Sequence, residues 1–398
     1  MYSLISKILR SGATLFSTFF LISLAWSSSV AAKDLVSARS YWEDVQGQAT
    51  FEDAQTRPYA AYGGILAKGY SDSAFWLRLR IEPAAAGDKL VLRIRPAFID
   101  QVVLFDPADA TRHGPATAGD MTPWSETEYQ SLNHGFLIAS LPQARDVYLR
   151  VSSTSTLMVH VEALTQLEAA RLDHTQELIY SVSMGLIVMF LAWVLVSWVN
   201  DRDHVNRAFV TKQLVSILYT AGYFGYFRVF LSEAASPASI NLIFNIVLIS
   251  ATGLAFWYET HFLRDYEPPA WLMHILRSLY AAAFVSMILL FAGYTRLALE
   301  LNMLMIGLGS ALLLIAVLVF IKGPSNKQTT GVPFRFNRGV IVVYYLSLSF
   351  ALWVAVWPSL GFDVATEYSL HNLVLNGFFS GLLMTILLQV RVRRFETN

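Results

Sequence analysis

The chain has 398 residues, of which 55% are apolar and 15% are charged. Soluble proteins contain about 25% charged residues, so this composition excludes a single soluble globular domain. Lysine plus arginine equals aspartate plus glutamate at 29 each, and the net charge therefore gives no indication of a nucleic-acid partner. The chain contains no cysteine, which excludes disulfides, thiolate catalysis and Cys-ligated metal sites.

Residues 1–32 have the pattern of a secretory signal peptide. Lys7 and Arg10 precede an uncharged stretch that ends in the small residues Ala31 and Ala32. The alternative is an uncleaved anchor helix, because an uncharged stretch of this length can span a bilayer. On either interpretation, the chain after this segment begins outside the cytoplasm.

Residues 33–163 are predicted to form an all-β periplasmic domain, either a sandwich or a jelly roll. In the segment 75–82, apolar residues alternate with Trp76, Arg78 and Arg80, a period of two that is typical of a half-buried strand. The same alternation occurs in four more segments: 90–95, 99–105, 147–152 and 157–162. Several short strands separated by turn-forming residues favour an antiparallel two-sheet arrangement.

The segment 164–177 changes to helical spacing and predicts a stalk that leads into a membrane helix bundle over 178–391. This second half contains seven long apolar runs, and about 20 residues suffice to cross a bilayer. The runs are 178–199, 213–231, 234–258, 278–295, 301–321, 339–362 and 368–390, with Arg228 inside the second. Most loop Lys and Arg residues fall on one side, so the positive-inside rule predicts a cytoplasmic C-terminal tail over 392–398.

Four segments carry a resemblance to a known family: residues 41–44 (YWED), 69–79 with its Phe75-Trp76-Leu77-Arg78 strand, 99–102 (IDQV) and 148–153 (YLRVSS). With these segments the chain resembles the bacterial seven-transmembrane receptors with diverse intracellular signalling modules (7TMR-DISM). The resemblance implies a signal sequence, a periplasmic β domain of the second extracellular type (DISMED2) and seven membrane helices. It also implies a kinase or diguanylate cyclase output, which is expected to be missing from this chain or supplied in trans.

Candidate ligand-binding residues lie on the polar side of the predicted strands. Arginine forks bind carboxylates and aromatic faces stack on planar groups or sugars, so one face of neighbouring strands is a candidate site for an acidic or saccharide ligand. The candidates are Trp76, Arg78, Arg80, Arg93, Arg95, Tyr148 and Arg150. The alternative is an ordinary solvated sheet face with paired charges, in which Trp76 requires a cover.

In the membrane half, small and amide residues are candidates for helix packing or switching. They are Gly377 and Gly381 in a GxxxG pattern, and the one-turn pairs Asn372 with Asn376 and Asn241 with Asn245. The amides are candidates for a switchable contact between helices, and the alternative is static structural bonding. Arg228 is expected to snorkel to water, Arg296 to pair with Glu300, and Glu259 to lie too near the inner interface for a proton path.

These features together predict a receptor in the bacterial inner membrane that senses a periplasmic small molecule or saccharide and signals to a cytoplasmic domain or partner protein. The family resemblance adds a homodimer as the expected assembly. No cofactor, metal or catalytic motif is predicted, and the chain is not expected to be an enzyme. Two alternatives stay open: a transporter or channel with an accessory domain, and a membrane enzyme that uses His371 with Asn372 or Asn376.

Overall fold

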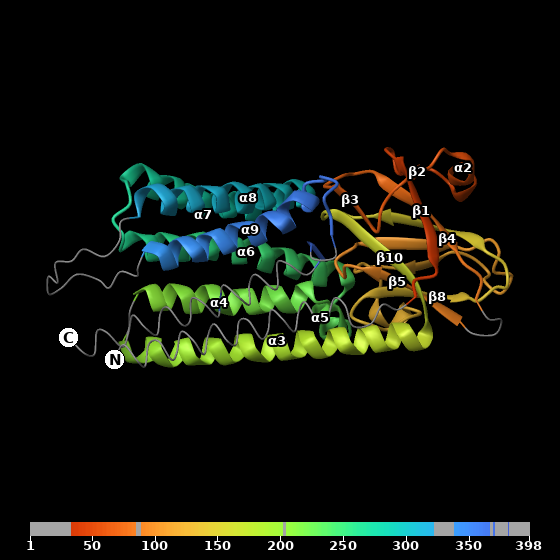
Figure 1. The fold of residues 1–398 in the computed structure, drawn as a ribbon, viewed down its shortest axis with the longest axis horizontal. Helices are drawn as coiled ribbons and strands as arrows, with labels where there is room; N and C mark the ends of the chain where they lie inside the picture. Colours follow the sequence, from red (N-terminus) through yellow and green to blue (C-terminus); the bar gives the residue numbers. More distant parts are fainter. Residues whose placement is uncertain are drawn as a thin grey trace.

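The computed structural model describes residues 33–84, 89–201, 204–321, 338–366, 369, 370 and 381. The β domain lies at one end of the molecule, and long helices extend from it along the long axis (Figure 1). The predicted signal peptide, the C-terminal tail and the larger part of the run 368–390 lie outside the described residues.

The β domain consists of two antiparallel sheets. The larger sheet has the strand order β2-β1-β4-β9-β6-β7 and the smaller has the order β3-β10-β5-β8. The larger sheet comprises β1 (Val36–Asp44), β2 (Ala60–Ala61), β4 (Ala74–Ile81), β6 (Gln101–Phe105), β7 (Ala116–Ala118) and β9 (Arg145–Ser152). The smaller comprises β3 (Ile65–Gly69), β5 (Lys89–Arg95), β8 (His134–Ala139) and β10 (Leu157–Thr165). Two short helices, α2 (Phe51–Thr56) and η1 (Trp124–Glu126), complete the domain.

One apolar core fills the space between the two sheets. Leu77 and Leu79 of β4, in the larger sheet, pack in the same cluster as Leu92 of β5 and Val161 of β10, in the smaller sheet. These side chains are fully buried, and their period of two is the one that the sequence shows. The predicted two-sheet antiparallel domain is therefore confirmed.

In the part of the chain that the structure describes, seven helices with defined bounds follow, six of them long. They are α3 (Gln166–Asp201), α4 (His204–Tyr223), α5 (Tyr226–Leu231), α6 (Pro237–Arg264), α7 (Ala270–Phe291), α8 (Thr295–Phe320) and α9 (Arg338–Ser359). Within the described residues, five are long and apolar enough to cross a membrane: α3, α6, α7, α8 and α9. Large apolar side chains such as Val188, Phe284 and Leu308 point outward from these helices, as expected for a surface in contact with lipid.

The run expected as the second membrane span differs from the prediction. It is divided at Gly225, which adopts a φ of 88°, so that α4 ends before it and the short α5 begins after it. α4 also includes Arg207 and Lys212, whose charges lower its hydropathy below that of the other long helices. The stalk expected over 164–177 is not a separate element, since β10 extends to Thr165 and α3 continues unbroken to Asp201.

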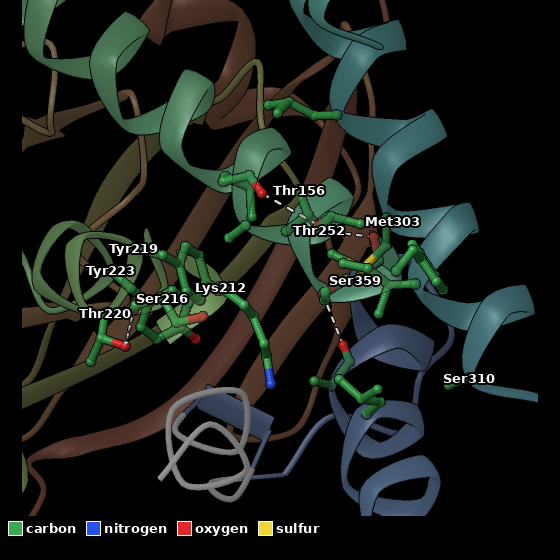
Figure 2. A pocket seen from close by; sticks show the side chains of 18 of the residues that line it. Thr156, Lys212, Ser216, Tyr219, Thr220, Tyr223, Thr252, Met303, Ser310 and Ser359 are labelled. Carbon is green, nitrogen blue, oxygen red and sulfur yellow. Dashed lines mark hydrogen bonds between the residues drawn. The ribbon is translucent and has the colours of Figure 1, made fainter. Parts of the chain in front are cut away.

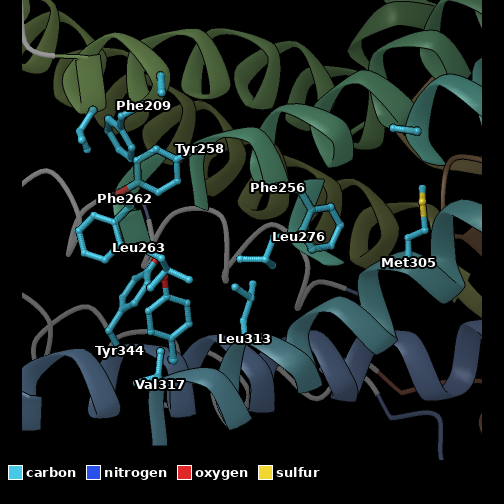
Figure 3. Close-up of a cluster of buried hydrophobic side chains, with 14 of the residues drawn as sticks. Phe209, Phe256, Tyr258, Phe262, Leu263, Leu276, Met305, Leu313, Val317 and Tyr344 are labelled. Atoms are coloured by element: carbon cyan, nitrogen blue, oxygen red, sulfur yellow. The ribbon is translucent and has the colours of Figure 1, made fainter. Parts of the chain in front are cut away.

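The helices pack around one apolar core whose largest aromatic group lies at the end of the bundle remote from the β domain. In Figure 3, Phe209 of α4, Tyr258 and Phe262 of α6 and Tyr344 of α9 gather there with Val317 of α8. The rings of Phe209 and Tyr258 meet edge to face with their centroids 5.5 Å apart. This aromatic cluster holds α4, α6 and α9 together beneath a cavity that lies nearer the β domain.

Candidate functional site

The outer face of the larger sheet is covered by α2. Thr50 caps this helix in a capping box with Asp53, which holds Phe51 over the sheet. The Phe51 ring lies 4.9 Å from that of Phe105, stacked, and 6.4 Å from that of Trp76. Trp76 is therefore only 1% exposed, and the side chain proposed as a ligand platform is part of a second small core.

Other members of the predicted site on this face also have protein partners. Arg78 lies 4.8 Å over the Tyr59 ring, Arg80 Nη1 lies 3.1 Å from Asp146 Oδ1, and Arg150 Nη2 donates to the Gly47 carbonyl at 2.8 Å. Tyr148 is 8% exposed beneath Phe51. Burial raises the pKa of the Tyr59 hydroxyl to about 12. The predicted arginine and aromatic set on this sheet is thus a paired surface, with Arg80 its most exposed member.

Arg93 and Arg95 do not share that face, and the prediction that all seven residues do is wrong. β4 pairs with β1 and β9, whereas β5 pairs with β10 and β8 in the other sheet. The outer face of β5 packs against the start of α3, which explains why β5 is buried from Leu90 to Arg95. The two arginines consequently lie at the junction between the β domain and the helices.

A buried polar network connects Arg93 to α3. Arg93 Nε donates to Asp173 Oδ1 at 2.7 Å, its Nη1 to Glu162 Oε2 at 3.1 Å, and its Nη2 to Gln176. The same Asp173 accepts from the Tyr129 hydroxyl at 2.8 Å and from Asn133 Nδ2 at 3.2 Å. Arg93 is 3% exposed, and although burial alone lowers its pKa, Asp173 and Glu162 raise it.

Glu162 joins this network to Arg95 on β5 and to His160 on β10. Burial opposes its ionisation, but hydrogen bonding from His160 and the charges of Arg95 and Arg93 hold its pKa well below the usual range. Arg95 Nη2 and His160 Nε2 each lie 3.3 Å from Glu162 Oε1. Ion pairs of this kind, buried and multiply hydrogen-bonded, fix the relative position of the elements that they join.

A second polar contact joins α5 to the loop before β8. Arg228 Nη1 donates to His134 Nδ1 at 2.7 Å, and Nη2 donates to the Ser131 and Asn133 carbonyls at 2.9 and 3.1 Å. The guanidinium also lies 4.9 Å from the Trp124 ring centroid. Arg228 is 5% exposed, so the expectation that it snorkels to water is wrong.

Gly225 explains how α5 comes so close to this loop. A Cβ atom at this position would lie 2.7 Å from the Leu132 carbonyl oxygen, which is too near for any side chain. Its left-handed φ of 88° further favours glycine. The break between α4 and α5 therefore positions Arg228 against the β domain.

The environment of His134 predicts acid sensitivity of this contact. Because Arg228 only donates, His134 Nδ1 accepts, and Nε2 donates to the Ala97 carbonyl at 2.9 Å. Burial, with a smaller contribution from Arg228, lowers the His134 pKa well below its ordinary 6.5. Below pH 6.5 the unfolded chain therefore binds a proton that the folded chain excludes, and stability falls as pH decreases. We expect the midpoint of thermal unfolding of the full chain to fall between pH 7 and 5, and the His134→Gln variant to show a shallower fall. Equal slopes for both proteins would contradict this assignment.

Two contacts join the far side of the β domain to α8 and α9. The Thr156 hydroxyl donates to the Ser359 carbonyl at 2.8 Å, and Arg296 forms an ion pair with Asp72 rather than the expected pair with Glu300. The backbones of Gly69 and Gly361 come so close that a Cβ on Gly69 would lie 2.9 Å from the Gly361 nitrogen. The β domain is therefore held at α3, α5, α8 and the end of α9.

A cavity of about 220 Å³ extends from the β domain into the helices (Figure 2). Tyr70 and Thr156 of the β domain line its outer end, and Lys212 of α4 and Glu259 of α6 line its inner end. The sequence predicts that Glu259 lies too near the inner interface for a proton path. In the structure Glu259 is buried beside the cavity, and its carboxylate accepts from the Tyr345 hydroxyl.

Comparison with known protein families assigns the β domain to a family. Residues 37–165 match the family model described as 7TMR-DISM extracellular 2. These residues form a 7TMR-DISM extracellular 2 domain. No curated protein matches the chain. With the five membrane-span-like helices that follow, the chain is a multi-pass membrane protein with an extracellular N-terminal domain.

The helix residues singled out from sequence have mixed outcomes. Asn245 Nδ2 donates to Asn241 Oδ1 at 3.0 Å, so this pair bonds within α6 rather than between helices. Asn241 instead contacts Met121 of the 7TMR-DISM extracellular 2 domain. A Cβ on Gly381 would lie 3.2 Å from Gln213 Nε2 of α4, consistent with close packing there. Gly377, Asn372, Asn376 and His371 lie outside the described residues.

Sequence reasoning missed the partners that make the junction. Asp173 and Gln176 are three residues apart on α3 and therefore share a helix face, and this face meets β5 of the 7TMR-DISM extracellular 2 domain. The available signal was two arginines in the apolar part of a strand, and an acidic residue about two turns into the first long helix that follows the strands. Arginines in a strand that is buried on both faces require buried acceptors.

Proposed function

We propose that the chain is a membrane receptor whose extracytoplasmic domain senses a small molecule and whose helices relay the event to a cytoplasmic kinase or diguanylate cyclase partner. In this proposal residues 1–32 are a signal peptide, seven helices cross the bacterial inner membrane, and the C-terminus is cytoplasmic. The chain relays and does not itself catalyse a reaction. A homodimer is the proposed assembly.

The network around Arg93 is the observation that supports this function. It joins a central strand of the smaller sheet to α3, a helix that continues without a break into the membrane-spanning part. A displacement of the sheet is therefore transmitted to α3 instead of being absorbed by a flexible linker. A receptor requires an element that contacts the sensor domain at one end and the membrane helices at the other, and whose position depends on the ligand.

The proposed ligand is carbohydrate-like or an acidic small molecule. Of the predicted binding residues, exposed Arg80 and half-buried Arg78 and Arg150 still reach solvent. We expect one compound in a panel of acidic sugars and cell-wall fragments to raise the thermal midpoint of the full chain in lipid nanodiscs. Arg78→Ala with Arg80→Ala should reduce that shift, and a panel without any shift would contradict this ligand class.

Relay is tested separately from binding. Because the chain has no cysteine, Trp271→Cys and Val340→Cys place two spin labels at the starts of α7 and α9, where both side chains are exposed. The ligand identified above should change the distance between the labels, and Arg93→Met should abolish the change while binding persists. Arg57→Met, at an exposed arginine of the same domain outside the predicted binding set, is the control and should leave the change intact. Binding without any change of distance in the parent protein would refute the relay.

The transporter alternative gains one supporting observation, namely the charged residues Lys212 and Glu259 at the cavity. Intramembrane charges of this kind often mark a substrate path. A transporter predicts net flux of the bound compound into proteoliposomes, which a receptor does not. Uptake that is abolished by Glu259→Gln would favour transport over relay.

A further inference from the structure

The cavity between the helices has a polar inner end and an apolar middle. Lys212 and Glu259 line the inner end, and the middle is lined by apolar side chains from α3, α6, α8 and α9. They are Ile187, Leu248, Ala255, Met303, Ile306 and Leu352. From Glu259 to Asn245 the lining follows α6 for about 21 Å at 1.5 Å per residue. The cavity is therefore long and narrow, with its charged groups at one end.

Lys212 lacks a close anionic partner among the described residues. Its Nζ lies 5.3 Å from the Tyr258 ring centroid and 5.6 Å from that of Phe209. No hydrogen bond or ion pair within 4.0 Å joins it to a described residue. In Figure 2 its ammonium group is directed away from the α4 backbone, at the end of the extended side chain.

Glu259 balances the charge of Lys212 without contacting it. Its carboxylate accepts from the Tyr345 hydroxyl, and no ion pair with Lys212 forms within 4.0 Å. The two groups give the inner end a net charge of zero, with hydrogen-bond donors on one and acceptors on the other. An anionic group placed there would be repelled by Glu259, and a cationic group by Lys212.

We propose that this cavity binds a single-chain amphiphile with an uncharged polar head, of the monoacylglycerol or long-chain alcohol class. The hydroxyl oxygen of the head accepts from Lys212 and its hydroxyl hydrogen donates to Glu259, so the half-buried ammonium and the buried carboxylate are bridged. The alkyl chain lies along the apolar middle and ends near Tyr70 and Met158 of the β domain. The binding site is separate from the outer face of the sheet and does not depend on the signalling role.

Three palmitoyl compounds that differ only in head charge test this proposal on the detergent-solubilised full chain. They are 1-monopalmitoylglycerol, palmitate and palmitoylcholine, with binding measured directly by radiolabelled ligand. We expect the parent protein to prefer the neutral compound. Glu259→Gln leaves Lys212 unbalanced and should shift the preference about tenfold toward palmitate, whereas Lys212→Met should shift it about tenfold toward palmitoylcholine.

Two further variants test where the chain lies. Ala255→Phe places a ring in the apolar middle and should weaken all three compounds, whereas Ala281→Phe changes an exposed position of α7 and should weaken none. If Lys212→Met does not fold, Glu259→Gln alone tests the head, because glutamine can still accept from Tyr345. Head preferences that stay the same in Glu259→Gln, or binding that is unaffected by Ala255→Phe, would overturn the proposal.

Discussion

Replacing Arg93 by methionine is expected to lower the free energy of unfolding of the full chain by about 3–5 kcal/mol. The substitution keeps most of the side-chain volume but leaves Asp173, 7% exposed, without its guanidinium partner. Glu162 loses one of its two guanidinium partners and keeps Arg95. An unpaired buried carboxylate loses water without gaining a compensating bond, which is why removing one member of such a pair costs more than the pair itself contributes. Denaturant unfolding in detergent micelles measures the loss.

Arg80→Met is the matched control for this substitution. Arg80 lies on β4, the strand that precedes β5 in the sequence, and also pairs with an aspartate, but its side chain is 46% exposed. Exposed pairs contribute about 1 kcal/mol or less, because water screens them. Equal losses for Arg93→Met and Arg80→Met would show that the network at the junction is not a structural connection.

Replacing Trp76 by alanine is expected to lower the free energy of unfolding by about 3–5 kcal/mol. Trp76 is fully buried between the sheet and α2, with its ring centroid 5.3 Å from that of Phe105, and no smaller side chain fills the space that it leaves. The loss should appear in denaturant unfolding, together with a weaker near-ultraviolet signal from the aromatic cluster.

Val45→Ala is the control for this second substitution, since Val45 is apolar but 72% exposed in the same domain. It should change stability by less than about 0.5 kcal/mol. A loss below about 1 kcal/mol for Trp76→Ala would mean that the ring has an open face. In that case the contact of α2 with the ring would contribute little to stability.

Local periodicity predicted the β domain well and its sheet pairing poorly. The alternation in the segment 75–82 correctly identifies β4 and the residues that face the core. It does not show that β5, the next strand in the sequence, belongs to the other sheet, because both pairings bury the same apolar residues. For this reason the sequence assigns Arg93 and Arg78 to one ligand-binding face, although their strands belong to different sheets of the sandwich.

The cover over Trp76 was equally hard to predict. α2 has six residues and begins 25 positions before Trp76 in the sequence, and its main signal is the capping box of Thr50 and Asp53. The long apolar runs in the sequence identified the five membrane-span-like helices. They did not identify Arg228 as buried or Lys212 as half-buried, because their neighbours come from distant segments: Ser131 and His134 for Arg228, and Tyr258 for Lys212.

The unbroken course of α3 has a mechanical consequence. Its 36 residues extend for about 54 Å, which exceeds the hydrocarbon thickness of a bilayer, and its outer end is clamped to β5 by the Arg93 network. Such a helix behaves as a lever. About 42 Å of the helix lies beyond Asp173, so a tilt of about 6° about the clamp would displace the inner end sideways by about 4 Å. A lateral movement of this size exceeds the shifts of about 1–2 Å that are typical of helices in switching proteins. In the proposed receptor, a small rearrangement in the sheet would therefore be enlarged along α3.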